Sequence, residues 1–315
     1  DALTGRFGHV SVFDAANDRL IVFGGKIGSS QVNDTWAYNR SGYAPGWHKL
    51  APAGTAPSPR QYAAAIYDAA NQRMLVFGGH NAGVGRMNEL WALGLNAGSE
   101  AWTQLAPTGS PSVRYFHSLV LDASRNRALM FGGSGASGNL NDVWTLDLGT
   151  LAWTQLAPSG AGPTPRYGAH VVVDAPRDRM VVFGGDTASG AASAQCFALS
   201  LAPGTETWTA LTPATPSGAP SARMLGACSY AANREAMFID SGYASGFNYT
   251  TDCWLLDFAS GDTWTPLPAD IAARVHFAQA DDAAPLSGWV SPQVSDMVQP
   301  AMPASPPTMA NPGRR

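Results

Sequence analysis

The sequence predicts an all-β fold, a β-propeller of four-stranded antiparallel blades. The main observation is a short apolar run that ends in two glycines and recurs along the chain. Intact copies lie at Ile21–Gly25, Leu75–Gly79, Leu129–Gly133 and Val181–Gly185, and a degenerate copy at Met237–Gly242. The glycine pairs of the intact copies are 54, 54 and 52 residues apart. Such a run indicates a buried strand with a tight, positive-φ exit. Recurrence at one period indicates an array of similar units.

The first half of each unit has a second regular pattern, an Arg followed eight residues later by an Asp. The pairs are Arg6/Asp14, Arg60/Asp68, Arg114/Asp122 and Arg166/Asp174, each with a mostly apolar strand between. The Asp favours a turn, because its carboxylate bonds nearby backbone N–H groups. A second Arg closes each turn, at Arg19, Arg73, Arg127 and Arg179. We expect it to pair with the Asp across the hairpin, contributing under about 1 kcal/mol if the pair is exposed.

The second half of each unit carries two aromatic residues, each on a predicted strand. The first set is Trp36, Trp91, Trp144, Phe197 and Trp254, and the second is Trp47, Trp102, Trp153, Trp208 and Trp264. A Pro-rich joint such as Ala106–Pro111 follows the second aromatic. Each unit therefore holds four short strands, and units of this length with a glycine signature are typical of propeller blades.

The order of a glycine pair, then an aromatic residue, then a Trp resembles the kelch repeat. The strand that starts Arg6-Phe7-Gly8-His9 or Arg114-Tyr115-Phe116-His117 is similar to those of kelch-like propellers in the galactose oxidase superfamily. The resemblance covers about residues 5 to 268 in five complete repeats. It implies that the first strands line a central channel and that ligands bind at its ends.

The C-terminal part departs from the repeat. A partial sixth unit starts at Arg274, so we predict a propeller domain over 1–292, intended as a six-blade ring rather than five blades that close alone. Residues 293–315 are rich in Pro, Ala and Ser and predict a disordered tail or linker. The chain is expected to be part of a longer multidomain protein.

The composition argues against several classes of partner and site. Only 13% of residues are charged and the net charge is −4, which argues against a nucleic-acid partner. No stretch approaches the ~18 apolar residues of a membrane span. Cys196, Cys228 and Cys253 are predicted to be free thiols. No metal or cofactor is expected. The pairs Asn33-Asp34, Asn88-Glu89 and Asn141-Asp142 suggest either Ca²⁺ ligands or turn capping, and capping is the favoured interpretation.

The Arg that opens each first strand is the leading candidate for ligand binding. If these strands line the channel, the arginines surround one mouth together with aromatic and imidazole groups, and such a funnel suits carboxylates or sugars. The alternative is structural: each Arg ties its blade to a neighbour by bonding backbone carbonyls. An identical residue in every blade favours that alternative. The candidates are Arg6, Arg60, Arg114, Arg166, Arg223, Arg274, Tyr62, Tyr115, His117 and Tyr167.

Loops that vary between repeats offer a second set of candidates, His80, Arg86 and Asp186 after the glycine pairs. We therefore predict a non-catalytic, exported or cell-surface propeller that binds a protein or glycan through the channel mouth and loops. The alternative hypothesis is an enzyme that uses an Arg/His/Tyr funnel on a small acidic sugar, epimerase-like, or an oxidase-like relative. No catalytic residue is assigned, although Arg114 and His117 would be the first to test.

Overall fold

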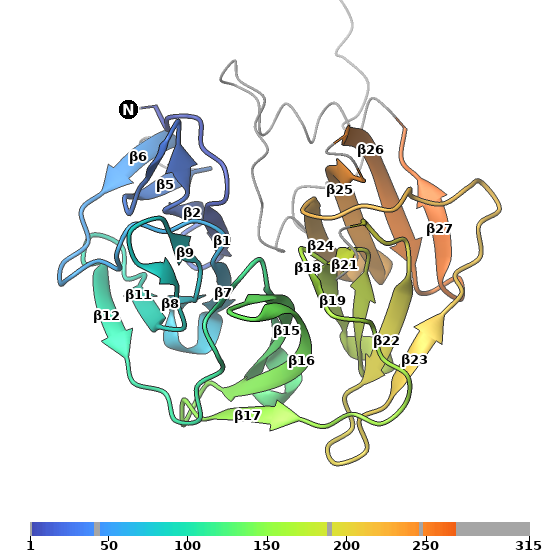
Figure 1. Cartoon of the computed structure of the whole chain (residues 1–315). Helices are drawn as coiled ribbons and strands as arrows, with labels where there is room; N and C mark the ends of the chain where they lie inside the picture. Colours follow the sequence, from blue (N-terminus) through green and yellow to red (C-terminus); the bar gives the residue numbers. More distant parts are fainter. Residues whose placement is uncertain (1, 41–44, 188–190, 246–247, 269–315) are drawn as a thin grey trace, which may run out of the picture.

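A computed structural model describes residues 2–40, 45–187, 191–245 and 248–268. The chain forms five four-stranded antiparallel sheets that follow one another as blades around a common centre (Figure 1). Within each blade the strands lie in sequence order from the centre outward. This confirms the predicted all-β propeller of four-stranded blades. The partial sixth blade, Arg274 and the 293–315 tail lie outside the described residues.

The strands match the predicted repeat. Blade one holds β1 (Val10–Asp14), β2 (Arg19–Phe23), β5 (Thr35–Asn39) and β6 (Gly46–Leu50). Blade two holds β7 (Ala64–Asp68), β8 (Arg73–Phe77), β11 (Leu90–Gly94) and β12 (Ala101–Leu105). Blade three holds β14 (Ser118–Asp122), β15 (Arg127–Gly135), β16 (Gly138–Asp147) and β17 (Trp153–Leu156). Blade four holds β19 (His170–Asp174), β20 (Arg179–Phe183), β22 (Cys196–Ser200) and β23 (Trp208–Leu211). Blade five holds β24 (Ala227–Ala231), β25 (Ala236–Ala244), β26 (Asn248–Asp257) and β27 (Thr263–Pro266).

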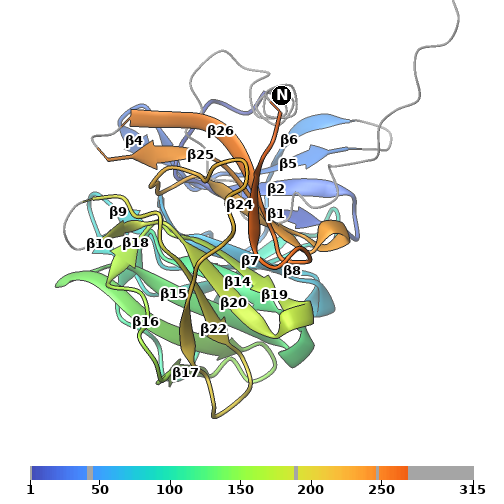
Figure 2. The same cartoon turned by 90° about the vertical axis from the view of Figure 1, so that its right-hand side faces the viewer.

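Short elements complete the blades. After the glycine pairs come β3 (Lys26–Ile27) with β4 (Ser30–Gln31), β9 (His80–Asn81) with β10 (Gly85–Arg86), and β21 (Asp186–Thr187). Before two first strands lie β13 (Arg114–Tyr115) and β18 (Arg166–Tyr167). Single 3₁₀ turns follow four first strands: η1 (Ala69–Asn71), η2 (Ala123–Arg125), η3 (Ala175–Arg177) and η4 (Ala232–Arg234). In Figure 2 β4, β9, β10 and β18 all lie toward the left side of the molecule, the face that carries the candidate site.

The hydrophobic core lies between successive blades rather than within one. Each of four buried clusters combines residues of two adjacent blades. The fourth-strand Trp of one blade packs on the Phe that precedes the glycine pair of the blade before it. Trp102 lies 4.6 Å from Phe23 between ring centroids, and Trp153 lies 5.0 Å from Phe77. A blade therefore hides its apolar face only against a neighbour, which explains why the array repeats.

The turn Asp and its closing Arg pair as predicted, but the pair is buried. Arg19 Nε lies 2.8 Å from Asp14, whose side chain is fully buried. The same guanidinium reaches Glu100 at 2.6 Å and the Leu95 carbonyl at 2.9 Å, both in blade two. The Arg19–Asp14 pair thus links two blades, and because it is buried the small energy expected of an exposed pair does not apply to it.

Two other expectations concern cysteine and the membrane. The three cysteines are free, as predicted. Cys228 and Cys253 lie on β24 and β26, which are separated by β25. Among the described residues no helix has the length and apolar character needed to cross a bilayer.

Candidate binding surface at the channel mouth

The five described first-strand arginines are buried, with only 0 to 3% of each residue exposed. In four blades the guanidinium donates to the carbonyl of the first glycine of its own blade, as Arg114 does to Gly132 at 3.1 Å. The backbone carbonyl of the same Arg accepts from the glycine pair of the preceding blade, as Gly79 N–H donates to Arg114 at 3.0 Å. The structure therefore gives these arginines the structural role that stood as the alternative. Their burial removes them from the surface that a ligand meets.

A carboxylate neutralises the arginine in four of these blades. Arg114 makes a bidentate pair with Asp142, at 2.7 and 2.8 Å, and Trp144 Nε1 donates to the same carboxylate at 2.7 Å. The corresponding acids elsewhere are Asp34, Glu89 and Asp252. Burial alone would raise the pKa of Asp34, but hydrogen bonds from Arg6 and Trp36 hold it below its ordinary value. We call this Arg, acid and Trp unit the clamp.

The clamp explains the acids for which Ca²⁺ ligation and turn capping had been weighed. Both oxygens of Asp34 and of Asp142, and Oε2 of Glu89, accept from guanidinium and indole N–H groups. The Asn that precedes each acid does bond the next joint, as Asn88 Nδ2 donates to the Pro111 carbonyl at 3.0 Å. The described residues contain no cluster of three acidic, His or Cys side chains suited to a metal.

The glycine pair is required because the next blade approaches its backbone. Gly132 has φ +60°, and a Cβ there would lie 2.8 Å from the Arg166 carbonyl oxygen. Any larger residue would force the two blades apart at the point where the arginine backbone bonds across them.

Six half-buried apolar side chains surround the mouth beside the arginines. They occupy the first and second positions after the first-strand Arg, and we call them the aromatic rim: Phe7, Tyr62, Tyr115, Phe116, Tyr167 and Leu225. Tyr62 and Phe116 lie 4.0 Å apart between centroids, Tyr115 and Phe116 4.7 Å, and Phe116 and Tyr167 5.2 Å. Burial, with a smaller contribution from nearby acidic groups, raises the pKa of Tyr167 to about 12, so its phenol stays protonated.

The second rim position adopts a left-handed backbone in each of the five described blades. Gly8 and Gly168 have φ +65°, while Tyr62, Phe116 and Leu225 have φ +58°, +57° and +63°. The N–H of each such residue in blades two to five donates to the carbonyl of the equivalent residue in the preceding blade at 2.7 to 3.0 Å, so a chain of N–H···O=C bonds links blades one to five along the mouth. The glycines leave room for their neighbours, since a Cβ on Gly8 would lie 2.6 Å from the Tyr62 ring. A bulky residue at such φ is strained by about 1–3 kcal/mol.

The loop candidates lie against this rim. His80 is 5.4 Å from Tyr115 between centroids, and the exposed Arg86 sits over the same ring at 5.2 Å. Lys26 covers Phe7 at 5.7 Å. Asp186 accepts a hydrogen bond from the Tyr167 hydroxyl at 3.1 Å and is only 6% exposed. The structure thus gathers His80, Arg86, Asp186 and the tyrosines on one face.

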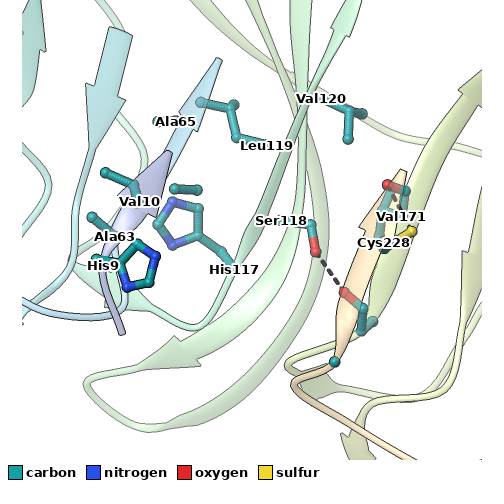
Figure 3. A pocket seen from close by; sticks show the side chains of 13 residues that line it. His9, Val10, Ala63, Ala65, His117, Ser118, Leu119, Val120, Val171 and Cys228 are labelled. Carbon is teal, nitrogen blue, oxygen red and sulfur yellow. Dashed lines mark hydrogen bonds between the residues drawn. The ribbon is translucent and has the colours of Figure 1, made fainter. Parts of the chain in front are cut away.

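A cavity of about 80 Å³ follows the channel, lined by residues of all five described first strands and the positions just before them (Figure 3). His9 and His117 lie on its wall, and neither nitrogen of His117 has a hydrogen-bond partner within the described parts of the chain. Burial, with help from the nearby Arg114 charge, lowers the pKa of His117 to about 3. His117 is therefore a neutral residue of the channel wall that lines the cavity and is not one of the rim side chains.

Comparison with known proteins identifies the repeat. A family model described as the KLHDC2/KLHL20/DRC7 Kelch-repeats domain matches residues 1–93, 44–175 and 150–275. The chain is a kelch-repeat protein. The resemblance noted from the glycine pairs and aromatics is thereby confirmed.

Several curated proteins share this kelch region. Kelch domain-containing protein 10 of Rattus norvegicus is 30% identical over 292 residues, which cover 86% of this chain and 67% of that protein. Putative adagio-like protein 2 of Oryza sativa subsp. japonica is 30% identical over 219 residues, or 65% of this chain and 34% of that protein. Acyl-CoA-binding domain-containing protein 4 of Arabidopsis thaliana is 36% identical over 119 residues, or 38% and 17%. The chain spans 34% of the length of the rice relative and 17% of that of the Arabidopsis relative.

Sequence reasoning missed two features of this kelch mouth. The clamp acids were visible as an acid 28 or 29 residues after each arginine in four repeats, a spacing that could have linked them. The rim residues Phe7, Phe116 and Leu225 were not among the predicted binding residues. No local signal distinguishes the left-handed backbone of Phe116 and Leu225, because glycine occupies the equivalent position in only two of the five described repeats.

Proposed function

We propose that this kelch propeller is a non-catalytic binding module that holds a segment of a partner protein on the aromatic rim. Kelch propellers generally mediate protein interactions, which supports this class of function. The observation that carries the proposal is the retention of Tyr62, Phe116 and Leu225 at positive φ. Glycine fits the same position at Gly8 and Gly168 without strain, so the large side chains are kept for the half-exposed surface they create.

The rim also indicates what the partner presents. Stacked aromatic rings of intermediate exposure suit an apolar or aromatic side chain, as the anchors of protein interfaces do. Arg86 is exposed at the edge of the rim beside Tyr115, where an acidic side chain of the same segment would find a partner. We therefore propose an extended segment with an apolar anchor and a neighbouring acidic residue. Export to the cell surface stays a prediction from the family resemblance.

The enzyme alternative has no comparable support. Arg114 and His117, on which it depended, are 0% and 6% exposed, and the Arg114 charge is neutralised by Asp142. A small acidic sugar at the mouth would meet the rim rather than these two groups. A glycan stacked on the rim tyrosines is the other candidate partner, and the experiment below separates it from a protein segment.

Selection of displayed random peptides against the full chain tests the proposal. Selected peptides are expected to contain an apolar anchor beside an acid, and to lose at least tenfold in affinity for Phe116→Gly. That variant places at 116 the residue found at Gly8, so the fold is expected to survive. Tyr38→Ala removes an aromatic residue on the outer part of blade one and is the matched control. Two outcomes would overturn the proposal. In one, the selected peptides bind equally well to the Phe116→Gly variant; in the other, the protein binds glycans but no peptide.

A further inference from the structure

Blade four departs from the other four described blades around the mouth. Its clamp has Gln195 in place of the acid and Phe197 in place of the Trp. Arg166 bonds the neutral Gln195 at 3.0 Å and lies over the Phe197 ring at 5.5 Å. Burial lowers the pKa of Arg166 to about 10, which leaves it charged at neutral pH. Blade four therefore lacks the carboxylate inside its clamp.

The same blade has a carboxylate at a position where the others have none. Directly after the glycine pair, the equivalent residues are Lys26, His80, Ser134, Asp186 and Tyr243. Asp186 pairs with Tyr167 in the β18–β21 ladder, so the acid belongs to the rim and not to the clamp. Blade four thus carries a carboxylate directly after the glycine pair and none in its clamp.

Asp186 is only half satisfied. Its Oδ2 accepts from the Tyr167 hydroxyl at 3.1 Å, while its buried Oδ1 has no hydrogen-bond partner within the described parts of the chain. Burial raises the pKa of Asp186, although the Tyr167 hydrogen bond acts in the opposite direction. A buried carboxylate oxygen without a donor is unfavourable and calls for a water, an ion or a ligand group.

The surroundings of Asp186 favour a cation. The adjacent Arg166 directs its guanidinium away, to the Thr164 and Gly184 carbonyls and to Gln195. The ring of Tyr167 stacks on Phe116, and other rings of the same rim already hold cations on their faces, Lys26 over Phe7 and Arg86 over Tyr115. Aromatic faces beside a carboxylate are the chemistry by which proteins bind ammonium groups.

We propose that Asp186, with the rings of Tyr167 and Phe116, binds an alkylammonium group of the segment held on the rim. The group is a lysine side chain, its methylated form or a chain N-terminus, all of which share this chemistry. The inference rests on the proposed function and adds a direction to it. The ammonium lies at blade four and the acidic residue at Arg86 of blade two, so the bound segment has one polarity.

Small probes test the site independently of any peptide. Choline and n-butylammonium are titrated into the full chain by calorimetry or ligand-observed NMR, each against a neutral isostere, 3,3-dimethylbutan-1-ol and n-pentane. At least one cation is expected to bind ten times more tightly than its isostere. Choline preferred over n-butylammonium indicates a methylated lysine, and the reverse indicates a primary amine. Equal affinity for both cations and their isosteres overturns the inference.

Two variants make the assignment specific. Asp186→Asn is expected to lose the tenfold preference for the cation. Asp178→Asn is the control for charge, since Asp178 pairs with Arg125 beside the η2 and η3 turns, away from the rim. A preference that survives Asp186→Asn, or that Asp178→Asn removes, contradicts the assignment.

The outcome can be separated from that of the proposed function. Peptides that bind the rim and depend on Phe116 but ignore Asp186→Asn would refute the ammonium site alone. Failure of every peptide and glycan to bind, with choline still bound through Asp186, would refute the protein-segment proposal alone.

Discussion

Blades three and four have the same strands, turn and glycine pair, yet they distribute charge differently. In blade three the buried Arg114 meets Asp142 in a bidentate pair, and Trp144 donates to the same acid. In blade four Arg166 meets only neutral acceptors, and the blade's carboxylate lies at the rim as Asp186. The comparison indicates that a neutralised clamp stabilises the fold, and in our proposal the departure of blade four from it serves ligand binding at the mouth.

The largest expected effect is on the clamp of blade three. Asp142→Ala leaves the fully buried Arg114 guanidinium without its counter-charge, and removing one partner of a buried pair costs about 3–5 kcal/mol. Gln195→Ala removes only a hydrogen bond to a charged group in blade four, about 1.5–3 kcal/mol. Equilibrium unfolding in urea measures both. Equal losses would contradict the difference drawn between the two clamps.

Substitutions at the second rim position are expected to change the free energy of unfolding less. In blade four the substitution adds backbone strain, and in blade three it removes strain. Gly168→Ala in blade four introduces a Cβ at φ +65° and 2.3 Å from Leu225, which is expected to destabilise by about 1–3 kcal/mol. Phe116→Gly in blade three relieves the same strain while it loses ring packing, so the free energy of unfolding should change by under about 1 kcal/mol. Urea unfolding checks both values. A Phe116→Gly loss as large as that of a core Phe would show that the ring is structural.

Acid should destabilise the fold through the channel histidines. Burial, with Arg6 and Arg114 nearby, lowers the pKa of His9 to about 4 and that of His117 to about 3, against 6.5 when unfolded. The unfolded chain therefore binds more protons as the pH falls below 6.5, and stability falls by about 1.4 kcal/mol per pH unit for each such histidine. The contribution of these histidines to stability is fully present above pH 6.5 and is lost progressively as the pH falls to their pKa values in the folded state.

His117→Ala separates this contribution, because Ala169 occupies the equivalent position in blade four. Between pH 6.5 and 4.5 the free energy of unfolding of the variant should fall less steeply than that of wild type, and the two slopes should differ by about 1.4 kcal/mol per pH unit. This window lies above the pKa values of Asp34 and Glu89, which their arginine partners hold down against the effect of burial. Stability curves of wild type and variant that run parallel there would contradict a neutral buried His117.

The sequence predicted the parts of the fold that local spacing encodes. The strands, the glycine pairs, the Asp–Arg turns and the fourth-strand Trp all lie within one repeat and recur, so they could be read from the chain. The structural alternative for the arginines was also available, because an identical residue in every blade suits a common frame. What sequence could not give was burial: the same Asp14–Arg19 spacing fits an exposed hairpin, whereas the next blade covers it.

The site was less predictable because its features depend on contacts between strands and between blades. The left-handed backbone of Phe116 depends on hydrogen bonds to Tyr62 on one side and Gly168 on the other. Asp186 was predicted as a variable loop residue, but only the structure shows that Tyr167 bonds its Oδ2 while its Oδ1 has no partner among the described residues. The contacts of Phe116 join neighbouring repeats and leave no trace in a single one, whereas the contact of Asp186 with Tyr167 lies within one repeat but depends on how its strands pair.

The clamp comparison is tested most directly by restoring the missing acid. Gln195→Glu gives blade four the carboxylate that Asp142 supplies in blade three, next to an arginine that is already buried and charged. Arg166 already donates a charge-assisted hydrogen bond to Gln195, and a carboxylate at this exposed position adds the attraction of an opposite charge, about 1 kcal/mol at most. Urea unfolding at pH 7 should therefore show a gain of up to about 1 kcal/mol. A loss of stability would contradict the claim that these arginines are internal clamps neutralised by an acid of their own blade.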